Sequence, residues 1–468
     1  MGHSSAHSPS VGDRFERALE AILARVSFCA DAPPTVAVAY SGGLDSSVLL
    51  RLAQQAAAAR GLRLFAFHIH HGLSLNADAW TAHCEGEAQA LSVAFEARRV
   101  QIDAAGRSGV EEAARLVRYA TLGDMCRQHG VSLLLTAHHL DDQAETVLLQ
   151  LLRGSGVAGL SGMDAVNAAP TLLGDPDLLM ARPLLDVGRA ELEAWAAKAG
   201  IRHVDDESNA DPRYARNALR HGVMQQLGQS FPGFQERLAR SAGHMQAAQR
   251  LLEQLAQEDL AACATGACLD LERLRALSSE RLDNLLRHWM SVQGVRMPST
   301  SWLAEMRTQL LQAKADAQLC VSHPDCAIRR HRNLVYLTPK WDADATDVAP
   351  LSFRWQGEAR LEFPAYRGRL HFEPAPEGLD AAWLRAQNLQ IRYRKGGETV
   401  KLAANRPTRS LKQHFQALGV PGWERPFLPL VMASQELLYA AGIGMDCHHI
   451  GMGQGDYIRL RWEHVLAV

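Results

Sequence analysis

The sequence predicts an α/β protein: a doubly wound parallel sheet in an N-terminal domain, then a helical domain and a small α+β domain. Strand-like and helix-like segments alternate through the first half of the chain, which is typical of a parallel sheet with helices on both faces. The second half loses this alternation, first to helices and then to short strand-like runs rich in Gly and Pro. We place the three domains at residues 1–225, 226–340 and 341–468.

Four apolar runs in the first half are expected to form the strands of the sheet. They are VAVAY (36–40), RLFAFHI (63–69), FEARRVQI (95–102) and VSLLLTA (131–137). The helices expected between and after them cover 46–60, 76–92, 110–129 and 141–153. In the first of these helices, Leu49, Leu52 and Ala56 recur at helical spacing. Ligands of such sheets bind at the carboxyl ends of the strands, so chemistry is expected there.

The second half begins with a segment that reads as helices, from about Phe231 to Lys340. The positions that lie roughly on one helical face are Phe234, Leu238, Ser241, Met245, Leu252 and Leu255. A linker, KWDADATDVAP (340–350), ends this segment. The residues after it include one expected helix near 409–418, and their composition indicates a small α+β domain.

The composition is that of an ordinary globular protein. The 468 residues are 47% hydrophobic and 21% charged, with a formal net charge of −2. This balance argues against wholesale non-specific nucleic-acid binding, but it leaves room for a local basic patch. No apolar run approaches the length of a membrane span, and the first ten residues lack the apolar segment of a secretory signal. We therefore expect a cytoplasmic protein with no membrane partner.

The eight cysteines are too sparse for a disulfide scaffold, and none forms a C-x-x-C pair. The nearest pairs, Cys263/Cys268 and Cys320/Cys326, are too loosely spaced for an obvious zinc or iron–sulfur knuckle.

The segment SGGLDSS (41–47) follows the first expected strand and has the features of an anion site. Two glycines allow a tight turn that exposes backbone N–H groups, and a helix expected to begin near Ser46 adds its positive dipole end. The segment is no Walker A loop, because G-K-[ST] is missing. Asp45 would repel a bare phosphate unless a divalent cation lay between them. The alternative is that Asp45 and Ser46 only cap the helix.

A second polar cluster, AHHLDDQAET (137–146), follows the fourth expected strand. Asp142 and Glu145 are three residues apart and share a helix face, where they could hold Mg²⁺ or position a nucleophilic amine. The alternatives are a capping box formed by these two acids and a transition-metal site that adds His138 and His139. A third segment, FHIHHGLS (67–74), is expected to place one histidine towards the cleft.

The order of these motifs resembles the tRNA(Ile)-lysidine synthase family of the PP-loop ATP pyrophosphatases. The matching segments are SGGLDSS, HIHHGLS, EEAARLVRYATL (111–122), AHHLDDQAET, LLRGSGVAGLSGM (151–163), RPLL (182–185) and DDESNADPRYARNALR (205–220). TRSLKQHFQALGVPGWERPFLPLV (408–431) resembles the second C-terminal domain of that family. Residues 164–181 look variable, and the first ten look like an extension.

The resemblance implies a ligase that attaches L-lysine to C2 of the wobble cytidine of an isoleucine tRNA with a CAU anticodon. ATP would adenylate the C2 oxygen, and the lysine amine would then displace AMP. The implied cofactors are ATP and Mg²⁺, and the implied partners are this tRNA and free L-lysine. The oligomeric state stays open, with a homodimer as one alternative.

The resemblance also suggests roles for individual residues. The ATP phosphates would bind at Ser41, Gly42, Gly43, Leu44, Asp45 and Ser46, with Asp45 also holding Mg²⁺. The candidate catalytic residues are Asp45, Asp142, Glu145, Arg115 and Arg216. The candidate substrate-binding residues are His71, His138, Asp141 and Arg118. For the arginines, the alternative is a weak surface ion pair with Glu111, Glu112 or Asp211.

A basic stretch near the C-terminus is the expected tRNA footprint. From Arg392 to Arg425 there are eight basic and two acidic residues, on a chain that is close to neutral. The candidate contacts are Arg394, Arg406, Arg409, Lys412 and Arg425. The alternative is an ordinary solvated face.

Three other functions are weaker alternatives. A PP-loop enzyme that thiolates tRNA usually needs C-x-x-C cysteines, and this chain has none. An amide-forming synthetase fed by ammonia would leave the basic stretch unexplained. A non-catalytic nucleotide- or RNA-binding module would avoid acids such as Asp141 and Asp142 beside an anion site.

Overall fold

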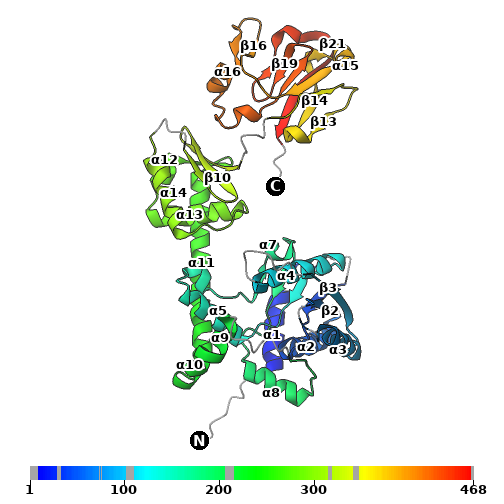
Figure 1. Cartoon of the computed structure of the whole chain (residues 1–468), viewed down its shortest axis with the longest axis vertical. Coiled ribbons are helices and arrows are strands. Elements are labelled where there is room, and N and C mark those ends of the chain that lie inside the picture. Colours follow the sequence, from blue (N-terminus) through cyan, green and yellow to red (C-terminus); the bar gives the residue numbers. More distant parts are fainter. Residues whose placement is uncertain are drawn as a thin grey trace. The chain divides into compact units, whose positions relative to one another are not determined.

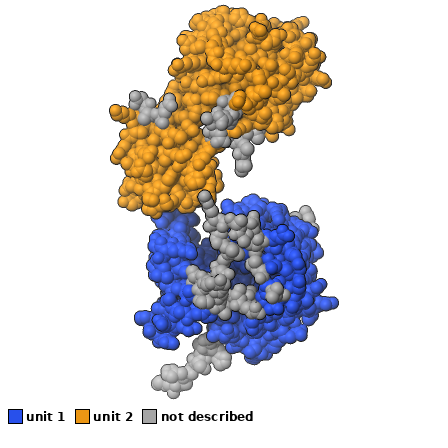
Figure 2. Space-filling model, in the orientation of Figure 1, with its two compact units in different colours: residues 1–255 blue, residues 256–468 orange. Residues whose placement is uncertain are grey.

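A computed structural model describes residues 9–28, 33–72, 74, 76–101, 110–205, 215–314, 319–340 and 347–464 of the chain. The fold divides into two compact units, Met1–Leu255 and Ala256–Val468 (Figure 2). The division falls inside one long helix, α11 (Phe234–Cys263). Each unit is described on its own.

Unit 1 is built on a six-stranded sheet in the order β3-β2-β1-β4-β6-β5. The strands are β1 (Thr35–Ala39), β2 (Arg63–His70), β3 (Ala94–Arg99), β4 (Leu133–Leu135), β5 (Val166–Ala168) and β6 (Leu179–Ala181). The first four strands coincide with the four predicted runs. All neighbouring pairs are parallel except β5 with β6. The prediction of a parallel sheet is therefore confirmed, with one antiparallel strand at its edge.

Helices cover both faces of this sheet, because alternate strand residues point to opposite sides. Val36 and Val38 of β1 pack with α1 (Val11–Leu23), α2 (Leu44–Arg60), α3 (Ala77–Ala90) and α8 (Arg189–Ala199). Ala37 packs on the other face with α4 (Val110–Gln128) and α7 (Pro170–Leu173). Figure 1 shows α4 and α7 on one side of the strands and α2 and α3 on the other.

The strand order places a switch point between β1 and β4. The chain winds from β1 outwards to β2 and β3, then returns to the other side of β1 with β4. Loops that follow β1 and β4 therefore diverge and leave a crevice at the carboxyl edge, where doubly wound sheets bind ligands. Both of the main sequence motifs follow these two strands.

The rest of unit 1 is helical. It consists of α5 (Leu140–Leu152), α6 (Val157–Leu160), α9 (Ala215–Ala218), the π-helical turn η2 (Leu219–Val223), α10 (Met224–Ser230) and the first part of α11. Gln246 of α11 donates to the carbonyls of Ser161 and Met163, at 2.9 and 3.1 Å. On α11, Phe234 is buried as predicted, but Ser241 is exposed and Ala242 is buried beside it.

Unit 2 begins with helices, as predicted, but these pack on a sheet that the sequence analysis missed. The helices are α12 (Leu271–Arg275), α13 (Ser279–Val292) and α14 (Thr300–Gln312). The sheet has the order β7-β8-β11-β10-β9. Its strands are β7 (Ala264–Thr265), β8 (Cys268–Asp270), β9 (Cys320–Ser322), β10 (Cys326–His331) and β11 (Leu334–Pro339). These strands are two to six residues long, too short for a clear alternating pattern.

The last part of unit 2 is the predicted α+β domain. One sheet joins β12 (Leu351–Phe353), β15 (Leu389–Arg392), β18 (Leu430–Ala433), β19 (Glu436–Ala440) and β20 (Gly444–Met445). A second joins β13 (Arg360–Phe363), β14 (Gly368–Asp380) and β21 (Gly451–His464), and a third joins β16 (Thr399–Val400) and β17 (Arg409–Ser410). The helices are α15 (Ala381–Ala386) and α16 (Leu411–Leu418), and α16 matches the helix expected near 409–418.

Among the described residues, no helix combines the length and the apolar composition that crossing a bilayer requires.

Candidate active site

The loop between β1 and α2 presents backbone N–H groups at the sheet edge. Helix α2 begins at Leu44, two residues earlier than predicted, and its N-cap Gly43 makes no side-chain cap hydrogen bond. The first-turn N–H groups therefore have no side-chain acceptor at the cap and point to where an anion would bind. The alternative that Asp45 or Ser46 serves as the cap is wrong, because both lie inside the first turn.

Gly42 allows the loop to make this turn. Its φ of +86° is unfavourable for other residues, and an added Cβ would lie 2.6 Å from Cys84 Sγ. The carbonyl of Gly42 accepts a hydrogen bond from the N–H of Val204 at 2.9 Å. The loop is thus held between α3 and the segment that follows α8.

The three serines of the motif have different roles. The Ser46 hydroxyl donates to the Gly43 carbonyl at 3.0 Å and lies 3.0 Å from Ser41 Oγ. The Ser47 hydroxyl donates to the Gly42 carbonyl at 3.3 Å. Ser47 therefore stabilises the turn, whereas the partly buried Ser41 hydroxyl can still donate to a ligand.

Asp45 has one paired and one unpaired carboxylate oxygen. Its Oδ2 lies 2.9 Å from Nη1 of Arg189, at the start of α8, which the sequence analysis had not singled out. Its Oδ1 is enclosed and, in the part of the chain that the structure describes, has no hydrogen-bond partner. Burial raises the pKa of Asp45, against the lowering effects of His139 and Arg189. An enclosed, unpartnered carboxylate oxygen beside an anion site fits an oxygen-preferring cation such as Mg²⁺.

His139, which the sequence analysis named only as part of an alternative transition-metal site, lies close to the carboxylates of Asp45, Asp141 and Asp142. It is only 1% exposed and is the N-cap of α5, where its ring accepts from the Asp142 N–H and Asp142 Oδ2 accepts from the His139 N–H. Its Nε2 lies 3.3 Å from Asp142 Oδ2 and 3.8 Å from Asp45 Oδ2. The capping box thus pairs His139 with Asp142, so the predicted alternative of a box between Asp142 and Glu145 is wrong.

Glu145 and Asp142 share a second unexpected partner, Arg220 on η2. Arg220 Nε and Nη2 donate to the two oxygens of Glu145 at 2.6 and 3.0 Å, and Nη2 also donates to Asp142 Oδ1 at 3.1 Å. Burial raises the pKa of the fully buried Glu145 despite this pairing. For Asp142, burial opposes ionisation, but His139, His138 and Arg220 outweigh it and lower the pKa.

Asp141 connects three helices. Its Oδ2 accepts from the backbone N–H of Arg189 at 2.8 Å, and its Oδ1 accepts from Gln235 Nε2 at 3.3 Å. These contacts join α5 to α8 and α11. In the structure as described, Asp141 acts on the site by positioning Arg189.

His138 follows β4, and its Nδ1 lies 3.0 Å from Thr136 Oγ1. Burial lowers its pKa, Asp142 opposes this, and the cations Arg182, Arg216 and Arg115 lower the pKa further. His138 is therefore neutral near pH 7.

The predicted arginines lie on two helices, α4 and α9. Arg115 and Arg118 both stack over the ring of Tyr119 on α4, at 5.1 and 5.2 Å from its centroid. Arg216 Nη2 donates to Thr146 Oγ1 at 3.1 Å, and its Nε lies 3.9 Å from Glu145 Oε2. The acids predicted as alternative partners, Glu111, Glu112 and Asp211, have side chains outside the described residues.

His68 and His70, at the end of β2, have structural partners. His68 Nδ1 lies 2.9 Å from the Tyr40 carbonyl, and His70 Nε2 lies 3.0 Å from Asp78 Oδ1. His71, the predicted substrate contact, follows directly after β2 and is partly buried.

The basic stretch of unit 2 surrounds a pocket of about 480 Å³. Its lining includes Arg394, Lys395, Gly396, Gly397, Ser410 and Lys412. Arg406, Arg409 and Lys412 are exposed, whereas Arg425 donates to the Val420 carbonyl at 2.9 and 2.7 Å and so braces the fold.

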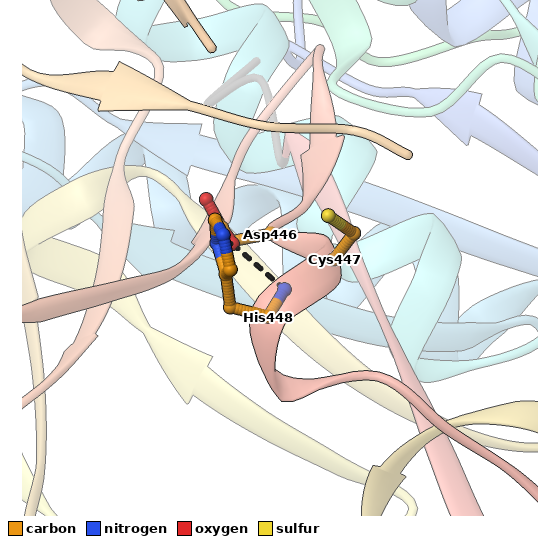
Figure 3. A group of neighbouring side chains, drawn as sticks. All are labelled: Asp446, Cys447 and His448. Carbon is orange, nitrogen blue, oxygen red and sulfur yellow. Dashed lines mark hydrogen bonds and ion pairs between the residues drawn. The ribbon is translucent and has the colours of Figure 1, made fainter. Parts of the chain in front are cut away.

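A metal-like trio in the same domain, Asp446, Cys447 and His448, is explained without a metal (Figure 3). Asp446 Oδ1 accepts from the N–H and from Nδ1 of His448, at 2.9 and 2.6 Å, and Oδ2 accepts from the Lys401 N–H at 3.0 Å. The carboxylate is thus fully used as a helix cap and a loop anchor.

Comparison with known proteins agrees with this arrangement. Family models match three segments: a PP-loop domain at residues 12–227, a TilS substrate binding domain at 269–336 and a TilS substrate C-terminal domain at 389–462. Among curated relatives, the tRNA(Ile)-lysidine synthase of Ralstonia nicotianae is 44% identical over 91% of this chain and 92% of its own length. The tRNA(Ile)-lysidine synthase of Burkholderia pseudomallei is 41% identical over 92% of this chain and 93% of its own length. The chain therefore belongs to the tRNA(Ile)-lysidine synthase family.

Proposed function

We propose that this chain ligates L-lysine to C2 of the wobble cytidine of a tRNA(Ile) with a CAU anticodon, using ATP. The observation that carries the proposal is the polar set at the switch point. It comprises an α2 N-terminus without a side-chain cap, an oxygen of Asp45 that has no partner among the described residues, and His139, whose Nε2 lies 3.8 Å from Asp45 Oδ2 and 3.3 Å from Asp142 Oδ2. Family membership supports the same conclusion.

The ATP phosphates would lie against the N-terminus of α2. The N–H groups that follow Gly43 and the hydroxyls of Ser41 and Ser46 would donate to them. Asp45 Oδ1 would bind Mg²⁺, and this ion would neutralise the triphosphate during displacement. Arg189, which pairs with Asp45 in the structure, is in reach of the same anion.

Two displacements would follow at this site. The C2 oxygen of cytidine attacks the α-phosphorus of ATP, the bond to pyrophosphate breaks, and pyrophosphate leaves. The ε-amine of lysine then attacks C2, the C2–O bond breaks, and AMP leaves. The attacking amine must lose a proton to solvent in this step. Burial and the neighbouring arginines lower the pKa of His138, so its ring is too weak a base to take that proton, and it would instead accept a hydrogen bond that orients the amine.

The carboxylates near this site serve different roles in the proposal. Glu145 and Asp142 hold Arg220, which would keep a positive charge beside the reacting phosphate. Among the described residues, the four carboxylates of Asp45, Asp141, Asp142 and Glu145 outnumber the three guanidiniums that pair with them, those of Arg189, Arg216 and Arg220. This acidic group therefore suits a lysine ammonium as well as a metal ion.

The tRNA would bind across residues 226–340 and 341–468, with contacts at Arg394, Arg406, Arg409 and Lys412. Among the described residues, the basic side chains that line the pocket, those of Arg394, Lys395 and Lys412, form no ion pair, which supports this. We place the reaction in the cytoplasm. The site residues come from one chain, so the proposal does not require a dimer.

Thiolation, the alternative PP-loop chemistry, is disfavoured by the cysteines of unit 1. Cys84 and Cys126 are buried, and burial raises the pKa of both thiols to about 12. Neither of these described cysteines can supply a thiolate at neutral pH.

The test is transfer of labelled lysine to a tRNA(Ile) transcript with a CAU anticodon. Wild-type protein should incorporate lysine only with ATP and release AMP and pyrophosphate, and a transcript with a changed wobble base should stay unlabelled. No transfer, with ATP binding intact, would favour a non-catalytic nucleotide- or RNA-binding module.

A further inference from the structure

A buried arginine that the proposed reaction has not yet used lies at the carboxyl end of β6. Arg182 is only 7% exposed, yet in the part of the chain that the structure describes it contacts no carboxylate. Its Nη1 donates to the Asp164 carbonyl at 2.7 Å and to Asn167 Oδ1 at 2.8 Å, and its Nε is enclosed without a partner. Burial lowers the pKa of Arg182, and Tyr119 and Asp164 oppose this without forming an ion pair with the guanidinium, so a ligand anion would stabilise the buried cation further.

Two more cations gather around the same aromatic ring. Arg115 and Arg118 lie over Tyr119, whose ring is 3% exposed, and Arg182 interacts electrostatically with both Tyr119 and Arg115. Among the described residues, neither Arg115 nor Arg118 forms an ion pair. A cluster of three guanidiniums with so little compensation favours an anionic ligand.

This cluster lies near the acidic group formed by Asp142 and Glu145. His138 is a neighbour of both groups, since it interacts electrostatically with Asp142 and with Arg182 and Arg115. Strands β4 and β6 are adjacent and parallel, so both groups lie at the same sheet edge. A small zwitterion, with ammonium and carboxylate groups on one molecule, matches this pattern of charge.

We infer that Arg182, together with Arg115 and Arg118, forms a subsite for the α-carboxylate of the amino-acid substrate. The inference rests on the proposed function. The degree of burial favours a carboxylate over a phosphate of the RNA backbone: a carboxylate is attached at one point and can enter a closed end, whereas a phosphodiester must carry a nucleotide on each side. Arginine also matches a carboxylate with two parallel hydrogen bonds.

The experiment compares L-lysine with L-lysinamide, which has nearly the same size but no carboxylate. kcat/KM for each is measured in the wild type, in Arg182→Gln and in Arg127→Gln. Arg127 is a matched control, because it is an exposed arginine on α4 that pairs with Asp124. Wild type should prefer lysine, and Arg182→Gln should lower kcat/KM for lysine about 10- to 100-fold while leaving that for lysinamide unchanged. Arg127→Gln should change neither value.

Other results would overturn the inference. An equal fall for lysine and lysinamide in Arg182→Gln would assign Arg182 a structural role, and a rise in KM for tRNA alone would assign the subsite to an RNA phosphate. Pyrophosphate release with tRNA and ATP in the absence of lysine reports whether the variant is folded. If Arg182→Gln loses this release, the variant Arg182→Lys, which keeps the positive charge, is used in its place. Arg182→Lys should release pyrophosphate and retain part of the preference for lysine over lysinamide. Equal use of lysine and lysinamide by a folded Arg182→Lys would count against the subsite. Failure of wild-type protein to transfer lysine would instead refute the proposed function.

Discussion

The Arg220–Glu145 pair offers a sharp test of how the acidic side of the site is held. In Arg220→Met, Glu145 would lose both of its short hydrogen bonds while staying fully buried. Removing one partner of a buried pair costs about 3–5 kcal/mol, and because Arg220 is 32% exposed, we expect a cost near the lower end, about 3 kcal/mol. For a unit of this size, that corresponds to a fall of roughly 6–12 °C in Tm.

The pH dependence of this loss identifies its cause. Burial already raises the pKa of Glu145 in the folded chain, and removal of Arg220 would raise it further. When the pKa of a carboxyl group is higher in the folded chain than in the unfolded chain, its contribution to stability is fully present below the unfolded-state pKa. This contribution is lost as the pH rises through the folded-state pKa. The destabilisation of Arg220→Met should therefore be large at pH 7 and shrink as the pH falls into the ordinary range of Glu.

Scanning calorimetry of the full chain from pH 4 to pH 8 would measure this. Adding Glu145→Gln to Arg220→Met should remove the pH dependence and recover part of the stability. Arg127→Met, which breaks the exposed pair with Asp124, should cost no more than about 1 kcal/mol. A loss in Arg220→Met that is equally small, or independent of pH, would show that water screens the pair and that our reasoning on the buried carboxylate is wrong.

Three further predictions concern the rest of the site. Asp45→Asn should abolish Mn²⁺ binding in the presence of ATP, as measured by electron paramagnetic resonance, and undiminished binding in this variant would exclude Asp45 as a ligand. Because burial raises the pKa of Asp45, Mn²⁺ binding by the wild type should weaken as the pH falls towards that raised pKa. Gly42→Ala should destabilise unit 1 by about 1–3 kcal/mol in urea unfolding, since φ is +86° and Cys84 Sγ blocks the new Cβ, and a cost below this would mean that the loop can shift. Arg394→Glu should raise KM for tRNA. It should also reduce the slope of log affinity for tRNA against log salt concentration by at least about 0.7–0.9, whereas charge reversal at the exposed Lys340 should leave this slope unchanged.

Local patterns in the sequence were sufficient to predict the strands and loops that carry the acidic residues of the site. The four strand runs, the glycine turn and the acidic start of α5 are each encoded by neighbouring residues, and the rule that ligands bind at carboxyl ends of strands then brought Asp45 and Asp142 to one edge. His139 could also have been found, because a side chain able to accept a hydrogen bond three residues before Asp142 is the spacing of a capping box.

The arginine partners could not be predicted in this way. Arg189 meets Asp45 across 144 residues of sequence, and Arg220 meets Glu145 across 75. Such pairs depend on where whole helices pack, and the local sequence around each arginine reads equally well as an exposed helix face. The sheet of β7–β11 was missed for a similar reason, since its short strands are stabilised mainly by their pairing with each other.

The distribution of these missed arginines suggests how one crevice can serve two successive displacements. In the proposed reaction, adenylation would need positive charge near ATP, and Arg189 and Arg220, each held by carboxylates, would supply it. Attack by an amine would need the opposite environment, because an ammonium must be attracted and then deprotonated. A site that pairs some cations with acids, while Arg182 forms no ion pair among the described residues, would attract both a polyanion and a zwitterion. The sequence motifs supply the acids of such a site, while the placement of its cations follows from the packing of α4, α8 and η2 around the sheet.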